Sequence, residues 1–139
     1  PGDIVLAGDF QGLGHDQVLF INNDGAYGRV AIVDFSGPTA NRLHYEAYGA
    51  SSLLDGWHEP GDVVLAGDFQ GLGHDQALFI NNGPDPSEGR VLVMDFATGT
   101  WNRTDHEDGE ELDGWRIAEF VCAGRALDGS RDALVVLPH

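Results

Sequence analysis

The stretch VLAGDFQGLGHDQ occupies residues 5–17 and occurs again, unchanged, at residues 64–76. Thirteen identical residues at an offset of 59 positions indicate a tandem duplication. The match extends beyond these thirteen residues. PGD at 1–3 recurs at 60–62, LFINN at 19–23 recurs at 78–82, and LDGW at 54–57 recurs at 112–115. A unit of roughly 60 residues has the size of four short strands with their connections. The duplication therefore predicts an all-β chain built from similar sheets.

A third copy of the unit begins after the second and covers only its first part. Ala123-Gly124 aligns with Ala66-Gly67, and Asp132-Ala133-Leu134 aligns with Gln76-Ala77-Leu78. This alignment makes the third loop, at residues 125–132, one residue shorter than the other two. The chain is thus expected to be a single repeat region, residues 1–139, with units at 1–59, 60–117 and 118–139.

Runs of Val, Ile, Leu and Phe between glycine-containing turns predict the strands. The expected strands are residues 3–8, 17–22, 29–35 and 42–48 in the first unit, 62–67, 76–81, 90–96 and 100–106 in the second, and 119–123 and 133–137 in the third. The first three strands of a unit are nearly continuous apolar runs, which predicts sheets covered on both faces. The fourth is polar and aromatic, which is typical of an outer edge. We expect β-propeller blades of four antiparallel strands, about two and a half blades per chain.

The antiparallel order assigns the loops to two ends of each sheet. One end receives the loops at 9–16 and 68–75, together with the turns at 36–41 and 97–100. The other end receives the loops at 22–28 and 81–89, together with the links around Trp57 and Trp115. A site formed by several loops is therefore expected to draw its residues from only one of these two sets.

The loop DFQGLGHDQ, residues 9–17, lies between the first two expected strands. It resembles the FG-GAP/VCBS repeat, the blade unit of integrin-like propellers, and through repetition the resemblance covers essentially the whole chain. In that family the loop often reads Asp-x-Asp/Asn-x-Asp-Gly-x-x-Asp and binds calcium. The resemblance implies candidate calcium ligands in both loops: Asp9, Gln11, Asp16, Asp68, Gln70 and Asp75.

The residues themselves predict that calcium is held weakly or not at all. Calcium prefers six to eight oxygen ligands, several of them carboxylates. Leu13 stands where a third acidic ligand is usual, and Gln17 stands where the last Asp is usual. We instead expect the glycines to allow a tight turn with positive φ and Asp9 to accept backbone N–H groups within it. No other cofactor is expected, and His15 is expected to lie on the surface.

Trp57 and Trp115 each follow Leu-Asp-Gly in the links between units. Aromatic rings beside carboxylates and amides commonly hold neutral sugars, because the ring covers C–H faces while the polar groups bind hydroxyls. The candidate sugar-binding residues at this end are Trp57, Trp115, Asp55, Asp113, Asn22, Asn23, Asn81, Asn82, His58 and Arg116. The alternative is that both tryptophans are wedges that fill the gap between adjacent blades.

The charge of the chain limits its partners. Its formal net charge is −16, with seven Arg and no Lys. Such a surface repels nucleic acid and anionic membranes, so neither is expected as a partner. His15 and Asp16 are adjacent, but no Ser or Cys nucleophile accompanies them, so we expect no enzyme.

The sequence thus predicts a non-enzymatic binding module, with extracellular or cell-surface carbohydrate recognition as the first choice. The alternative is a structural or protein-interaction propeller scaffold, a module of a larger surface or toxin-like protein. Because two and a half blades leave apolar faces uncovered, a homo-oligomer is expected to complete the propeller, unless other blades of a longer chain do so.

Overall fold

The computed structural model describes residues 3–22, 29–47, 63–80, 91–97, 102–106, 121–125 and 132–136. Within these ranges the chain is all-β, without a helix, and the ends of its strands lie within two residues of those expected. The strands are β1 (Ile4–Gly8), β2 (Gln17–Asn22), β3 (Arg29–Asp34), β4 (Asn41–Ala47), β5 (Val63–Gly67), β6 (Gln76–Ile80), β7 (Val91–Asp95), β8 (Asn102–His106), β9 (Val121–Arg125) and β10 (Asp132–Val136). The described residues contain no helix that is long and apolar enough to cross a membrane.

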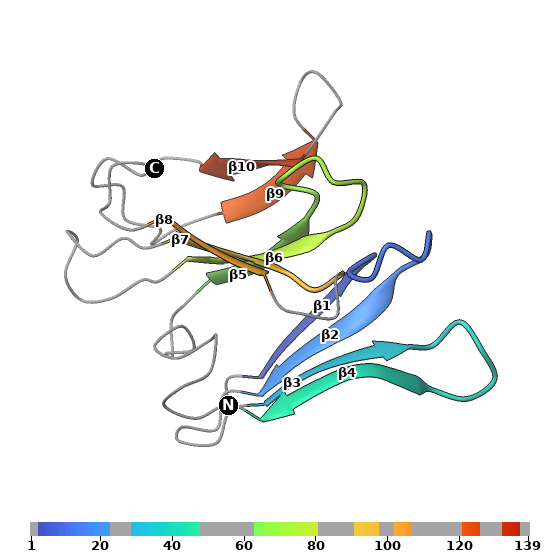
Figure 1. The fold of residues 1–139 in the computed structure, drawn as a ribbon. Coiled ribbons are helices and arrows are strands. Elements are labelled where there is room, and N and C mark those ends of the chain that lie inside the picture. Colours follow the sequence, from blue (N-terminus) through green and yellow to red (C-terminus); the bar gives the residue numbers. More distant parts are fainter. Residues whose placement is uncertain are drawn as a thin grey trace.

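The strands form three antiparallel sheets (Figure 1). The first sheet has the order β1-β2-β3-β4, the second β5-β6-β7-β8, and the third contains β9 and β10. Each four-stranded sheet therefore follows the chain order, with the polar strand β4 or β8 at one edge, as predicted. Figure 1 shows the second sheet between the other two. The strands that begin the three sheets lie next to each other, because β1 contacts β5 and β5 contacts β9.

The strand register corrects the alignment of the third unit. Gly8 pairs with Gln17 and Gly67 with Gln76, while Gly124 pairs with Ala133. The spacing between these partners is the same in all three sheets, so the third loop is not shorter than the others. The expected alignment of Asp132 with Gln76 is wrong by one position, because hydrogen-bonded register rather than residue similarity decides equivalence. Asp132 takes the register position of Asp75.

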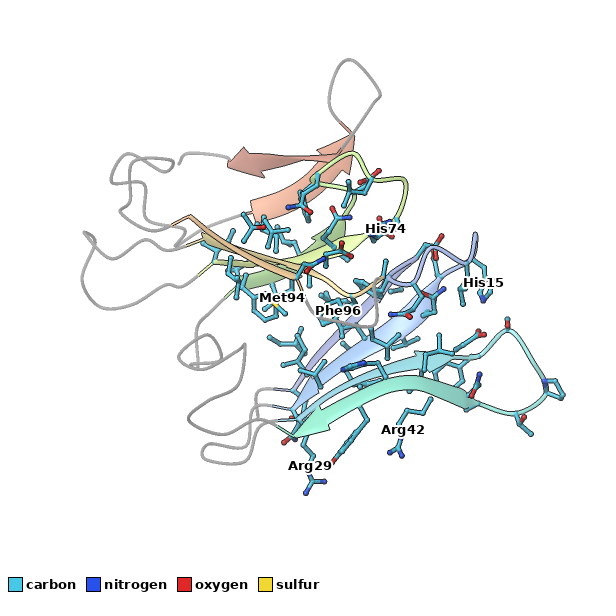
Figure 2. The ribbon with its side chains drawn as sticks, viewed as in Figure 1. His15, Arg29, Arg42, His74, Met94 and Phe96 are labelled. Atoms are coloured by element: carbon cyan, nitrogen blue, oxygen red, sulfur yellow. The ribbon has the colours of Figure 1, made fainter. Side chains whose placement is uncertain are left out.

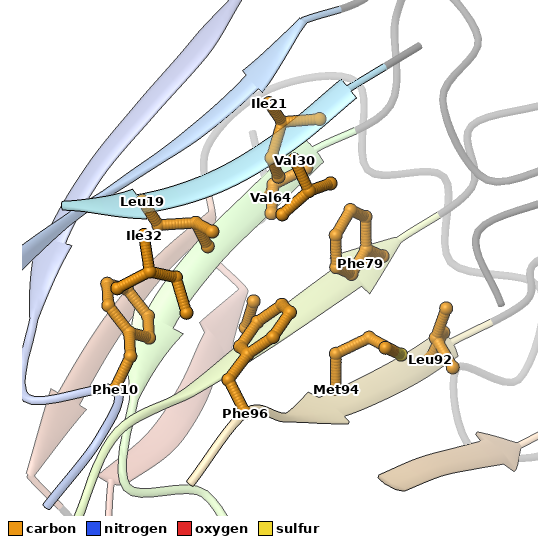
Figure 3. Packing of buried hydrophobic residues seen from close by; sticks show 11 residues of the cluster. Phe10, Leu19, Ile21, Val30, Ile32, Val64, Phe79, Leu92, Met94 and Phe96 are labelled. Carbon is orange, nitrogen blue, oxygen red and sulfur yellow. The ribbon is translucent and has the colours of Figure 1, made fainter. Parts of the chain in front are cut away.

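A single apolar layer joins the first two sheets (Figure 3). One face of the first sheet contributes Leu19 and Ile32, and the facing side of the second sheet contributes Phe79 and Met94, all at most 1% exposed. Phe10, from the loop after β1, contacts Phe96 edge-on, with ring centroids 6.2 Å apart and an interplanar angle of 89°. Burial of these side chains stabilises the stack by roughly 25 cal/mol per Å² of apolar surface removed from water.

The second sheet has a further apolar layer on its opposite face, where Leu78, Ile80 and Val93 are buried. It is therefore covered on both sides, as its continuous apolar strands predicted. The first sheet differs, and a face left open in this way was expected for a chain of about two and a half units. Its outer face exposes Val5 by 58% and Phe35 by 54%, because no described part of the chain packs against that side.

Candidate functional site

The loop after β1 folds around the carboxylate of Asp9. The two oxygens of this carboxylate accept the backbone N–H groups of Leu13 at 2.7 Å and Gly14 at 2.8 Å. The side-chain amide of Gln17 donates to the same carboxylate at 3.2 Å. Gly12 and Gly14 have φ angles of 66° and 78°, which only glycine adopts without strain. The predicted turn, with Asp9 accepting backbone N–H groups inside it, is confirmed.

The loop after β5 repeats this arrangement. The carboxylate of Asp68 accepts the backbone N–H groups of Leu72 at 2.7 Å and Gly73 at 2.9 Å. Gly71 and Gly73 have φ angles of 70° and 81°. The duplicated residues therefore produce the same hydrogen-bonded turn twice, which indicates that the turn is determined by the repeated segment itself.

A buried glutamine closes each loop from inside. Gln17 is fully buried, and its carbonyl oxygen accepts the backbone N–H of Gln11 at 2.9 Å. Its amide nitrogen donates to the backbone carbonyl of His15. Gln76 is equally buried and accepts the backbone N–H of Gln70 at 3.0 Å. An amide suits this position better than a carboxylate would, because it both donates and accepts.

The surroundings of Asp9 favour its charged form. Partial burial raises the pKa of the carboxyl, but hydrogen bonds from Gly14, Gln17 and Leu13 and the charge of His15 lower it by more. The pKa of Asp9 therefore lies below its ordinary value. Hydrogen bonds that are donated to an ionised carboxylate stabilise it in this way. Asp9 is thus a charged structural group whose oxygens already accept three hydrogen bonds.

Each loop is also tied to the end of the third strand by a His–Asp pair. His15 Nε2 lies 3.1 Å from Asp34 Oδ1, and His74 Nε2 lies 2.9 Å from Asp95 Oδ1. The imidazole of His15 is 41% exposed, as a surface histidine was predicted to be, whereas that of His74 is 15% exposed. The sequence analysis missed these pairs, although Asp34-Phe35 and Asp95-Phe96 both follow the repeat pattern.

The aspartates of these pairs have backbone partners as well. Asp34 accepts the backbone N–H of Ser36 at 2.8 Å and its hydroxyl at 3.1 Å, while Asp95 accepts the backbone N–H of Ala97 at 2.9 Å. The two bonds from Ser36 lower the pKa of Asp34 below its ordinary value. Burial raises this pKa by less than either bond, and the contact with His15 lowers it by a still smaller amount. These contacts place the loop at 9–16 and the turn at 36–41 at one end of the sheet, as predicted.

The two loops meet across the interface between the first and second sheets. The carboxylate of Asp75 accepts the backbone N–H of Asp9 at 2.7 Å, and the backbone N–H of Asp75 donates to the carbonyl of Asp9 at 3.0 Å. A Cβ atom at Gly8 would lie 2.7 Å from the Asp75 carboxylate, so a larger residue there would have to displace this carboxylate from the joint. We call this pair of hydrogen bonds the intersheet joint. Asp16, the equivalent of Asp75 in the first unit, is exposed.

The remaining candidate metal ligands lie in different surroundings. The side-chain amide of Gln11 donates to the backbone carbonyl of Phe96, at 2.6 Å, and so crosses to the second sheet. The amide of Gln70 lies 3.5 Å from the hydroxyl of Thr104. In the part of the chain that the structure describes, no three His, Cys, Asp or Glu side chains come together as metal ligands. Weak or absent calcium binding stays a prediction.

Of the candidate sugar-binding residues, the structure describes Asn22. Its side-chain amide donates to the carboxylate of Asp3 at 2.8 Å, at the end of the first sheet opposite the Asp9 loop. This position agrees with the expected division of the loops between two ends. The other candidates lie outside the described residues: Asn23, Asp55, Trp57, His58, Asn81, Asn82, Asp113, Trp115 and Arg116.

Comparisons with models of protein families, with curated proteins and with solved structures found no match to this chain. The family resemblance of the loops therefore rests on the residues quoted above. What the chain does has to be argued from its own geometry.

Proposed function

We propose that the chain is a β-propeller repeat module that binds a ligand and does not catalyse a reaction. The observation that carries the propeller arrangement is the contact of β1 with β5 and of β5 with β9. In a propeller the first strand of each blade lies near the central axis, so first strands of consecutive blades are neighbours. The polar strands β4 and β8 are at the opposite edges of their sheets, where the outer rim of a propeller lies.

The hydrogen bonds at the Asp9 end favour a structural role for its polar residues. A general base needs a lone pair that can reach a substrate proton. The oxygens of Asp9 accept backbone N–H groups, and Nε2 of His15 and Nε2 of His74 contact Asp34 and Asp95. These residues fix the loops and join the sheets. The proposed ligand site is therefore at the opposite end, and any calcium in the loops would be held weakly.

The ligand class that we propose is a neutral carbohydrate, bound at the cell surface or outside the cell. The support comes from Trp57 and Trp115 beside aspartates in equivalent links of the repeat. Asn22 and Asp3 add an amide and a carboxylate at the end of the first sheet where these links are expected. Aromatic faces with amides and carboxylates around them match the alternating C–H and hydroxyl surfaces of a sugar.

A glycan array with the purified chain tests this proposal. We expect saturable binding to at least one glycan, and we expect the Trp57→Ala and Trp115→Ala variants to lose it. Trp101→Ala is the matched control, because Trp101 is in the expected fourth strand of the second unit rather than in a link. Saturable binding that survives both link substitutions would place the site elsewhere. No binding to any glycan would contradict the proposal that the ligand is a carbohydrate.

A second candidate function is a structural or protein-interaction scaffold, and one observation favours it. The outer face of the first sheet exposes Val5, Phe35 and Tyr45 by 58%, 54% and 46%. Large apolar side chains exposed on one face are typical of protein-interaction surfaces. A chain that binds no glycan but binds a different protein through this face would support the scaffold.

A further inference from the structure

The first sheet has one face that the rest of the described chain leaves open. The strand register places Val5 opposite Phe20, Phe20 opposite Ala31, and Ala31 opposite Tyr45, so these four residues form one row on the same face. Val5, Phe20 and Tyr45 are exposed by 58%, 37% and 46%. Figure 2 shows that Arg29 and Arg42 also point away from the second sheet. We call this face of the first sheet the open face.

The second sheet shows what covers such a face. Val64, Phe79 and Phe96 are the repeat equivalents of Val5, Phe20 and Phe35, and they are exposed by only 9%, 1% and 2%. They pack in the apolar layer against the inner face of the first sheet. Within this chain, therefore, the natural cover for this kind of face is a further sheet of the same repeat.

The intersheet joint also indicates that each sheet packs on the sheet that precedes it in the chain. Asp75 of the second sheet accepts the backbone N–H of Asp9 in the sheet before it. Asp16, its equivalent in the first sheet, is exposed, as expected if it serves a sheet that lies outside the described residues. By the register of β9, the residue that takes the place of Asp9 in the third sheet is Arg125. An arginine there has a charge opposite to that of Asp16.

We propose that the open face is an assembly surface that binds the third sheet of a second copy of this chain. The copies pack head to tail. The first sheet of one copy packs on the third sheet of the other in the way that the second sheet packs on the first sheet within one chain. Asp16 of one copy then lies at the joint position next to Arg125 of the other. An interface between two different surfaces is heterologous, and it forms a ring when the rotation closes.

Sedimentation velocity at micromolar concentration, with the mass checked by light scattering, tests this proposal. We expect the wild-type chain to form a closed oligomer, and we expect Phe20→Asp to weaken its association by about a hundredfold or more. Leu72→Asp is the matched control, because Leu72 is an apolar residue, 52% exposed, in a loop away from the open face. It should leave the association unchanged.

A second variant covers the case in which Phe20→Asp does not fold, as judged by circular dichroism. Asp16→Arg changes only an exposed loop residue, removes the acceptor of the joint and places like charges together. We expect it to weaken association by about tenfold or more. A wild-type chain that stays monomeric overturns the proposal and points to further repeats of a longer polypeptide as the cover. Association that both variants leave intact also overturns it.

Discussion

The first and second sheets have nearly the same sequence but different surroundings. Phe79 is 1% exposed and Phe20 is 37% exposed, although both belong to the same LFINN segment. Phe96 and Phe35 differ even more, at 2% and 54%. The apolar pattern therefore predicts which sheet faces can pack against another sheet. Whether a face is covered depends on which sheet lies next to it.

The largest effect is expected when the two equivalent phenylalanines are compared. Phe79→Ala removes a buried ring and should lower the free energy of unfolding by about 3–5 kcal/mol. Phe20→Ala, measured at a concentration where the chain is monomeric, should lower it by about 1 kcal/mol or less. Urea unfolding followed by circular dichroism gives both values. Equal losses would mean that the two faces do not differ in burial.

The intersheet joint should give the next largest difference. Asp75→Ala leaves the part-buried backbone N–H of Asp9 without its acceptor and should cost about 1–3 kcal/mol of unfolding free energy. Asp16→Ala is the same substitution at the exposed equivalent and should change the monomer by less than about 0.5 kcal/mol. If both variants lose the same amount, the hydrogen bonds of the joint do not stabilise the stack.

The smallest effect concerns pH. The pKa of Asp9 is below its ordinary value of 3.8 in the folded chain, so its charged form stabilises the fold above that pH. This contribution is lost as the pH falls through the lowered pKa. The destabilisation by Asp9→Asn should therefore shrink by about 1 kcal/mol or less between neutral pH and strongly acidic pH. Urea unfolding at both pH values measures it, with Asp16→Asn as the control for losing one charge. A cost that is independent of pH would contradict this role of the carboxylate.

Local features of the fold were predictable from the sequence. The strands follow from apolar runs between turns, and the positive φ angles of Gly12 and Gly14 follow from glycine at the tight turn. The assignment of loops to two ends follows from antiparallel order alone. These features depend on neighbours along the chain, which periodicity and turn residues describe well.

The contacts between units were not predictable in the same way. Asp75 was assigned to a metal site, but its carboxylate holds the backbone of Asp9, 66 positions away in sequence. The pairing of His74 with Asp95 likewise joins a loop to a distant strand end. Residue type predicts that a carboxylate will find a partner, but only the packing of the sheets decides which one. The alignment of Asp132 was wrong for a similar reason, because strand register fixed it.

The intersheet joint also bears on the duplication that produced the two units. Gly8 and Asp9 of the first unit contact the neighbouring unit through Asp75, whose equivalent in the first unit is Asp16. Both halves of the joint lie within the thirteen residues that are identical in the two copies. A single duplication of the coding segment therefore produces two units that already fit, without any compensating mutation. The same arrangement restricts later substitutions, since a new residue in either half of the joint must still fit against the other unit.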